Sequence, residues 1–239
     1  MNPETTSVTG VLVTGKATER YPLAMNAVKA WLHQDYPGPR NLLVINDHPT
    51  EPLFLDKRQQ PRSVTEVQVQ GKHSLGELRN KAMDIADTDY MIQWDDDDFS
   101  HHNRLTYQVE NTQQDYMSTF RWEINCNLRD GNRFANNGKS IRGKGFPGTM
   151  LWPKTDYRFP DKGKAEDTEF VLHFAKARKL HVIANPPMMY LRFYHGYNTW
   201  SQKHVMQRKP GSRDLNQIED GYVSSVLETH YQDIVKNLQ

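Results

Sequence analysis

The sequence is poor in cysteine and in long apolar runs. Cys126 is the single cysteine among 239 residues, so an internal disulfide is excluded. No motif surrounds Cys126, so we interpret it as a core or surface residue rather than a nucleophile. No stretch approaches the roughly 20 apolar residues of a membrane-spanning helix. The first residues, MNPETTSV, lack the basic and apolar segments of a signal peptide. We therefore expect a cytoplasmic protein without a membrane span.

The sequence also lacks a large net charge, but its charges are unevenly distributed. The formal net charge is +1. Residues 1–120 contain 11 Lys or Arg against 17 Asp or Glu, whereas residues 121–164 contain 10 against 4. A divalent cation would offset the acidic part, and an anionic partner would suit the basic part.

Short apolar runs alternate with amphipathic segments in the first 100 residues. We expect strands at residues 11–13, 42–45, 64–69 and 90–92. One helix is expected from Pro22, and a second begins at Ser74, where Glu77 completes a capping box. Strands that alternate with helices predict a largely parallel sheet covered on both faces. In such sheets, ligands bind beyond the carboxyl ends of the strands.

The second half of the chain shows a weaker pattern. Residues 121–148 are rich in Gly, Asn and Arg, and we interpret them as irregular and mobile. Further strands are expected at residues 149–152, 181–184 and 188–194, and a helix at 166–179. A closing amphipathic helix is expected to pack on its own domain rather than on a partner subunit. Its apolar residues are Val223, Val226, Leu227, Ile234 and Leu238.

Four consecutive aspartates, Asp95 to Asp98, follow the strand at residues 90–92. Adjacent carboxylates repel one another, so the run is costly unless a cation neutralises it. A solvated acidic turn or a helix N-terminus is one explanation. The alternative is a metal site at the ligand-binding edge of the sheet, because carboxylate oxygens are the ligands that Mg²⁺ and Mn²⁺ prefer.

The order of motifs along residues 8–201 resembles the family-2-type glycosyltransferases of the GT-A fold, including phage-type members that modify DNA. The matching segments are AVKAWLHQDYPGPRNLLVINDHP at 27–49, Leu78 to Ala82, the DXD-type run Trp94 to Asp98, Ala165 to Asp167, and YLRFYHGYNTWS at 190–201. The first segment departs from the family pattern, since only Asp47 matches its usual pair of aspartates. Each motif is weak alone, but five in the right order are specific together.

The resemblance implies an α/β, Rossmann-like GT-A fold with a mostly parallel sheet, helices on both faces and a C-terminal helical extension. It implies a glycosyltransferase domain at 1–205, with a nucleotide-sugar half at 1–100 and an acceptor half at 101–205. Residues 206–239 would form the extension. The implied activity is a metal-dependent, inverting transfer of a hexosyl or pentosyl group from a nucleotide-sugar, with UDP as the expected nucleotide.

The resemblance also implies roles for individual residues. Asp97 would be the principal ligand of Mn²⁺ or Mg²⁺, with Asp95 near the metal or the ribose and His195 completing the site. Asp98 could instead cap the following helix, and His195 could be structural. The expected donor-binding residues are Asp47, Arg79, Asn80, Asp95 and Thr14.

The expected general base is Asp167, with Glu166 holding the acceptor or positioning the base. The acceptor hydroxyl loses a proton as it attacks, and a carboxylate on the acceptor side can take it. Ordinary acidic residues in a first helical turn would look the same in sequence.

Two other functional classes remain open. A nucleotidyltransferase would need a glycine-rich phosphate loop after the first strand, which residues 14–20 match poorly. A non-catalytic metal-binding or sugar-binding module would not need the Glu166–Asp167 pair.

The expected acceptor is a hydroxyl group of a surface glycan, and a lipid-linked glycan and nucleic acid are the alternatives. The basic segment 121–164 makes a phosphate-bearing acceptor attractive, including hydroxymethylated DNA bases that are flipped out of the duplex. On that hypothesis Arg133, Arg142 and Lys144 would contact backbone phosphates.

Overall fold

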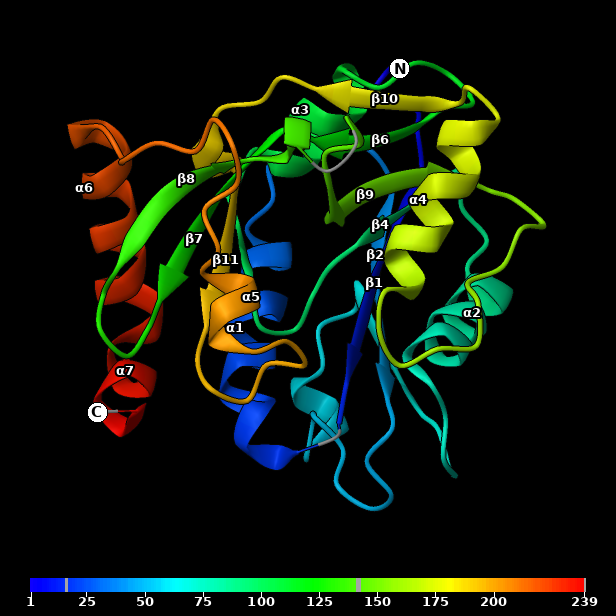
Figure 1. Cartoon of the computed structure of the whole chain (residues 1–239). Helices are drawn as coiled ribbons and strands as arrows, with labels where there is room; N and C mark the ends of the chain where they lie inside the picture. The colour runs from blue at the N-terminus through cyan, green and yellow to red at the C-terminus, as the bar shows by residue number, and fades with distance from the viewer. Residues whose placement is uncertain (16, 141–142, 239) are drawn as a thin grey trace.

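The computed structural model describes residues 1–15, 17–140 and 143–238. The described chain forms a mixed α/β fold that contains a seven-stranded sheet and a smaller four-stranded sheet (Figure 1). None of the helices in these ranges is long and apolar enough to cross a membrane.

The large sheet is mostly parallel, as predicted. Its strands lie in the order β10-β6-β9-β4-β1-β2-β3, and only β9 runs antiparallel to its neighbours. Its strands are β1 (Val8–Thr14), β2 (Arg40–Asn46), β3 (Val64–Gln68), β4 (Tyr90–Gln93), β6 (Met117–Phe120), β9 (Phe146–Pro153) and β10 (Leu180–Ile183).

Helices cover both faces of the large sheet. The α-helices of the described residues are α1 (Tyr21–Leu32), α2 (Leu75–Ile85), α3 (Arg104–Glu110), α4 (Glu166–Lys176), α5 (Gln202–Val205), α6 (Gln217–Val226) and α7 (Gln232–Leu238). Of these, α1 packs on one face of the large sheet, and α2 and α4 pack on the other. Trp31 of α1 packs with Leu12 and Val44 on one face, whereas Phe170 of α4 packs with Val11 on the other. Since successive strand residues point to opposite faces, the continuous apolar runs of β1 and β2 supply both cores.

The two predicted helix starts are confirmed. Pro22 occupies the first turn of α1, where its missing N–H costs nothing. At the start of α2, the Ser74 hydroxyl accepts from the Glu77 backbone N–H, and the Glu77 carboxylate accepts from the Ser74 N–H. These reciprocal bonds satisfy two N–H groups that the helix itself leaves unpaired.

The prediction that residues 121–148 are irregular is wrong for most of the segment. It contains β7 (Trp122–Asn127) and β8 (Arg133–Asn137), which pair as an antiparallel hairpin, and the start of β9. Apolar and polar residues alternate strictly along β7, from Trp122 through Ile124 to Cys126. The abundance of Asn obscured this two-residue period, which is typical of a strand with one polar face.

The small sheet joins this hairpin to the C-terminal part of the chain. Its order is β5-β11-β7-β8, where β5 is Phe99–Ser100 and β11 is Tyr190–Tyr194. Val223 of α6 and Tyr231, which follows α6, join the core cluster that contains Ile124 and Phe193. The closing helix therefore packs on its own domain, as predicted.

Candidate active site

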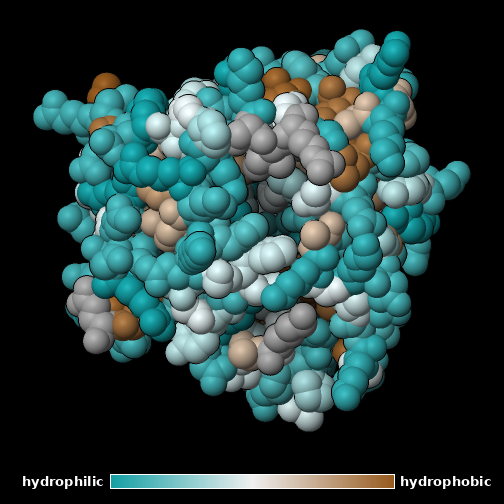
Figure 2. Space-filling model, viewed as in Figure 1, coloured by the Kyte–Doolittle hydropathy of each residue, from teal (hydrophilic) through white to brown (hydrophobic). Residues whose placement is uncertain are grey.

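The candidate active site is a cavity of about 380 Å³ at the carboxyl ends of β1, β2 and β4. In the large sheet β2 lies on one side of β1 and β4 on the other. Such a reversal of strand order is where open α/β sheets form ligand sites. The surface in Figure 2 is largely hydrophilic, with apolar residues in small scattered groups. The polar cavity is therefore a better candidate for binding than an apolar patch on this face.

Acidic side chains outnumber basic ones around the cavity. Among the described lining residues, eight carboxylates accompany five Lys or Arg side chains. The carboxylates are those of Asp47, Asp95, Asp96, Asp97, Asp98, Glu123, Glu166 and Asp167, and the cations are Arg20, Arg79, Lys164, Arg192 and Lys209. This excess of carboxylates favours a bound cation.

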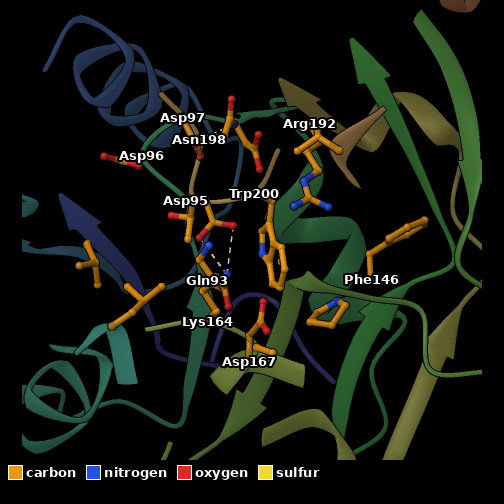
Figure 3. A pocket seen from close by; sticks show the side chains of 18 of the residues that line it. Gln93, Asp95, Asp96, Asp97, Phe146, Lys164, Asp167, Arg192, Asn198 and Trp200 are labelled. Atoms are coloured by element: carbon orange, nitrogen blue, oxygen red, sulfur yellow. Dashed lines mark hydrogen bonds between the residues drawn. The ribbon is translucent and has the colours of Figure 1, made fainter. Parts of the chain in front are cut away.

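Asp95 is held by side chains from three elements. Gln93 Nε2 at the end of β4 donates to both carboxylate oxygens, at 2.8 and 3.0 Å (Figure 3). The Tyr190 hydroxyl of β11 lies 3.3 Å from Oδ2, and Arg79 Nη2 of α2 lies 3.4 Å from Oδ1. Burial raises the pKa of Asp95, although Arg79 acts to lower it. Asp95 is thus fixed in one orientation on the cavity wall.

Arg20 neutralises two of the other aspartates and was not predicted from the sequence. It ends a short 3₁₀ turn, Thr18–Arg20, after β1. Its Nη2 pairs with Asp96 and lies 3.0 Å from Asp97 Oδ2. Burial raises the pKa of Asp96 to about 7, against the effect of Arg20. Burial also acts to raise the pKa of Asp97, but Arg20 and His195 outweigh it and hold that pKa below its ordinary value.

Asp98 connects the two sheets rather than capping a helix. Its Oδ1 accepts the backbone N–H of Phe193 at 2.9 Å, and its Oδ2 accepts the Tyr190 hydroxyl. The next helix, α3, begins only at Arg104. Burial raises the pKa of Asp98 well above its ordinary value.

His195 lies behind Asp97, completely buried, and is not among the cavity-lining residues. Its Nε2 is 3.1 Å from Asp97 Oδ2, and its Nδ1 accepts the backbone N–H of Tyr197 at 3.2 Å. An Nδ1 that accepts leaves the proton of a neutral imidazole on Nε2, which then donates to Asp97. Asn198 Nδ2 also approaches Asp97 Oδ2, at 3.3 Å. In this arrangement His195 and Asn198 orient Asp97.

Asp167 and Glu166 begin α4 in different environments. Asp167 lines the cavity and is partly exposed; its Oδ1 accepts the backbone N–H of Thr168 at 2.5 Å. Glu166 is 2% exposed, and its Oε1 pairs with Arg79 Nη1. Arg79 therefore joins Glu166 to Asp95 and ties the start of α4 to the four-aspartate run. Of the pair, Asp167 is the accessible carboxylate.

Asn80 does not line the cavity, in contrast to the expectation that it binds the donor. Its Nδ2 donates to the Phe159 carbonyl at 2.9 Å, and its Oδ1 accepts the Phe159 N–H at 2.9 Å. The reciprocal bonds hold the loop that leads into α4. Arg79, next to it, does line the cavity but is occupied with carboxylates.

Thr14 and Asp47, the two residues expected to bind the donor from strand ends, line the cavity at the ends of β1 and β2. The backbone N–H of Asp47 donates to the Thr14 carbonyl at 3.0 Å, which holds the two strand ends together. The structure thus brings together five predicted carboxylates, Asp47, Asp95, Asp97, Glu166 and Asp167, around one cavity.

Several cavity residues carried no sequence signal strong enough to select them. Arg20 stands in a loop that resembles no motif. Glu123 lies in the segment interpreted as irregular, where the alternation of β7 was the overlooked signal. Trp200 lines the cavity with Lys164 Nζ 5.3 Å from its ring centroid and His204 stacked on it at 4.3 Å. Arg192 and Trp200 belong to the closing YLRFYHGYNTWS stretch, but no role was predicted for them.

The basic segment is partly neutralised within the molecule. Arg133 Nε lies 2.6 Å from Asp220 Oδ1 of α6, and its Nη2 donates to the Ser224 hydroxyl at 2.9 Å. Arg133 and Lys144 do not line the cavity. Arg142 lies outside the described residues. Among the described Lys and Arg residues of 121–164, Lys164 alone lines the cavity, so most of the positive charge of this segment lies elsewhere.

No protein-family model and no curated protein sequence matches the chain. Crystal structures of S. aureus TarS do match. TarS 1–349 aligns with a TM-score of 0.57 at 16% identity, over 77% of this chain and 60% of TarS 1–349. The complex of TarS 1–349 with UDP-GlcNAc aligns with a TM-score of 0.61 at 12% identity, over 95% and 74% of the two chains. The first alignment spans about three fifths of TarS 1–349, and at these identities the likeness establishes a shared GT-A-type fold.

Proposed function

We propose that this protein is a glycosyltransferase that moves a sugar from a UDP-sugar to a hydroxyl group of a glycan. The main support is that one cavity, at the switch point of the sheet, holds both Asp97 and Asp167. In this proposal Asp97, whose Oδ2 is oriented by Arg20, His195 and Asn198, would bind a cation, and Asp167 would take a proton. TarS structures of the same fold were determined with UDP and with UDP-GlcNAc, which supports a nucleotide-sugar as donor.

In this proposal the uridine lies against the ends of β1 and β2. The Asp47 carboxylate would accept a hydrogen bond from the uracil N–H, with Thr14 beside it. Carboxylates accept but cannot donate when ionised, so Asp47 suits a base edge that offers an N–H.

Asp95 and Asp97 would hold a Mn²⁺ or Mg²⁺ ion together with the donor diphosphate. Among the described residues, no group of three or more His, Cys, Asp or Glu side chains is arranged to hold a metal by itself. Two carboxylates are enough for Mg²⁺, which proteins commonly bind through one or two carboxylates while substrate phosphates and water complete its coordination shell. The carboxylate excess of the cavity also fits, because a diphosphate would otherwise meet uncompensated negative charge. The cation would stabilise the charge that develops on the leaving diphosphate.

Asp167 would accept the proton of the attacking hydroxyl, since it is the accessible member of the pair at the start of α4. Glu166 would act as a positioning residue, because its ion pair with buried Arg79 fixes the first turn of α4. Attack from the side opposite the leaving diphosphate would invert the anomeric carbon.

The test is release of nucleotide from a panel of UDP-, GDP- and TDP-sugars, with and without chelator. The proposal predicts UDP release from at least one UDP-sugar, loss of release in excess EDTA, and recovery with Mn²⁺ or Mg²⁺. A nucleotidyltransferase would release pyrophosphate from a nucleoside triphosphate instead, and a binding module would release nothing. Absence of UDP release with every donor, with or without added glycans, would overturn the proposal.

A further inference from the structure

The small sheet has one apolar face and one polar face. Ile124 and Phe193 point into the core, whereas Glu123, Asn125 and Asn136 point the other way. These three polar side chains are at most 2% exposed. Burying polar side chains costs free energy unless they find hydrogen-bond partners. The polar face therefore needs an explanation.

Residues 195–209, which we call the strap, follow β11 and supply hydrogen-bond partners to Asn136 and to the Nδ2 of Asn125. Asn125 Nδ2 donates to the Val205 carbonyl at 2.9 Å, and Asn136 Nδ2 lies 3.3 Å from the Gln207 carbonyl. The Lys209 N–H donates to Asn136 Oδ1 at 3.0 Å. The amides of the polar face thus hold the strap across the small sheet.

The strap does not account for Glu123. This residue lies opposite Asn136 in the β7–β8 register. Its carboxylate accepts a hydrogen bond from the Asn125 side chain, but its Oε1 is buried without a hydrogen-bond partner in the described structure. Glu123 and Arg192 both line the cavity, and Glu123 is the acidic group that most favours the charged form of Arg192. Burial raises the pKa of Glu123 to about 7, although Arg192 acts to lower it. A carboxylate oxygen without a partner and a guanidinium therefore face the same space.

This pair belongs to the end of the cavity away from the donor. In Figure 3, Asp96 and Asp97 lie at one side and Arg192 and Phe146 at the other, with Asp95 and Trp200 between them. An acceptor must reach the reacting carbon from the side opposite the leaving diphosphate. An acceptor would therefore approach the end that contains Arg192, on which Glu123 exerts the largest acidic influence.

We propose that Glu123 and Arg192 form an acceptor-recognition site for the hydroxyl groups of a neutral sugar residue. Glu123 accepts a hydrogen bond from one hydroxyl, and Arg192 donates to another. The inference rests on the proposed glycosyltransferase function and makes its acceptor more specific.

A neutral hydroxylated ligand fits this site better than a phosphate does. A hydroxyl group both donates and accepts, so it can pair with Glu123 whether the carboxyl group is ionised or protonated. A phosphate would be repelled by an ionised Glu123 and would leave its buried oxygen without a donor. Arg133, which was a candidate for phosphate binding, is paired with Asp220 away from the cavity.

The test measures binding of four neutral methyl glycosides (glucoside, galactoside, mannoside and N-acetylglucosaminide) to the full chain with UDP present. Saturation-transfer NMR gives their affinities, and glycerol 3-phosphate and a short DNA duplex serve as anionic probes. At least one glycoside should bind the wild type. E123Q should weaken that binding about 10- to 100-fold, because a hydrogen bond to a charged acceptor is lost. E123D retains the carboxylate on a side chain that is one methylene shorter. Its affinity for the glycoside should lie between those of the wild type and E123Q.

Glu110→Gln, at the exposed end of α3, is the matched control and should bind like the wild type. Calorimetry should give the same UDP affinity for wild type and E123Q, and thermal unfolding checks that both are folded. Three results would each overturn the site: no glycoside binds the wild type, E123Q binds within twofold of it, or an anionic probe binds in place of the glycosides. Failure of the proposed function is a separate result, in which no UDP-sugar yields UDP.

Discussion

The two sheets contribute to the same cavity in different ways. The large sheet delivers its site residues from strand ends, after runs that are apolar on both faces, so Asp47 and Asp95 come at predictable points. The small sheet delivers Glu123 and Arg192 from within strands, on the face that also carries Asn125 and Asn136. Charged residues at strand ends do not interrupt the apolar core. The polar side chains of a buried sheet face, by contrast, need hydrogen-bond partners from other segments. On the proposed function, donor binding belongs to the first region and acceptor recognition to the second, with Asp167 of α4 between them.

The largest expected effect comes from Asp167, the proposed base, at the start of α4. Asp167→Asn is nearly isosteric but cannot take the proton, so turnover should fall on the order of 10²–10⁴-fold. Affinity for the UDP-sugar should change little. The measurement is steady-state transfer together with calorimetric donor binding. Glu169→Gln, on the same helix but outside the cavity lining, is the control. Near wild-type turnover in Asp167→Asn would move the base to another carboxylate.

The next effect concerns stability in the first region. Arg79→Met removes the partner of buried Glu166 and should lower the free energy of unfolding on the order of 3–5 kcal/mol, because it leaves an uncompensated buried carboxylate. The double variant with Glu166→Gln should recover at least half of that loss. Urea unfolding of both variants tests the coupling. A loss below about 1 kcal/mol in the single variant would show that the ion pair does not tie α2 to α4.

A smaller effect is expected for donor affinity. Asp97→Asn should weaken binding of a UDP-sugar about 10- to 100-fold in Mn²⁺, a cost typical of perturbed metal sites. The same variant should show little change in excess EDTA, where no metal links protein and diphosphate. Asp84→Asn, on the exposed side of α2, serves as control. Equal weakening with and without metal would argue that Asp97 acts on the structure and not through a cation.

The smallest effect is a pH dependence in the second region. The pKa of Glu123 in the folded protein is raised from 4.5 to about 7. Its stabilising contribution is therefore fully present below pH 4.5 and is lost as the pH rises through about 7. Glu123→Gln should match the wild type near pH 4. By pH 8 the free energy of unfolding of Glu123→Gln should exceed that of the wild type by about 1–3 kcal/mol. The difference between the folded and unfolded pKa of Glu123 sets the upper end of this range.

Chemical denaturation across this pH range distinguishes the two buried glutamates. Glu123→Gln should gain relative stability as the pH rises, whereas loss of the partner of Glu166 should destabilise at neutral pH. If Glu123→Gln shows no trend with pH, the carboxylate of Glu123 is better compensated by Arg192 than its surroundings indicate.

The sequence by itself determined the large sheet and one side of the site. Three features could be interpreted from local sterics and solvation alone. They are the apolar runs that are buried on both faces of the sheet, the Ser74–Glu77 capping box, and the acidic run after a buried strand. For that reason the parallel sheet and the placement of Asp47, Asp95 and Asp97 at its carboxyl edge were predictable.

Only the tertiary structure decided which partners these residues meet. Arg20, Glu166 and Arg79 are separated by dozens of residues in sequence, and their ion pairs depend on how α2, α4 and the loop after β1 pack. The small sheet is also non-local, since β11 pairs with β7 more than 60 residues earlier in the chain. Its polar strand looked irregular because the hydrogen-bond partners of Asn125 and Asn136 come from a distant segment, the strap 195–209, which the local sequence does not reveal.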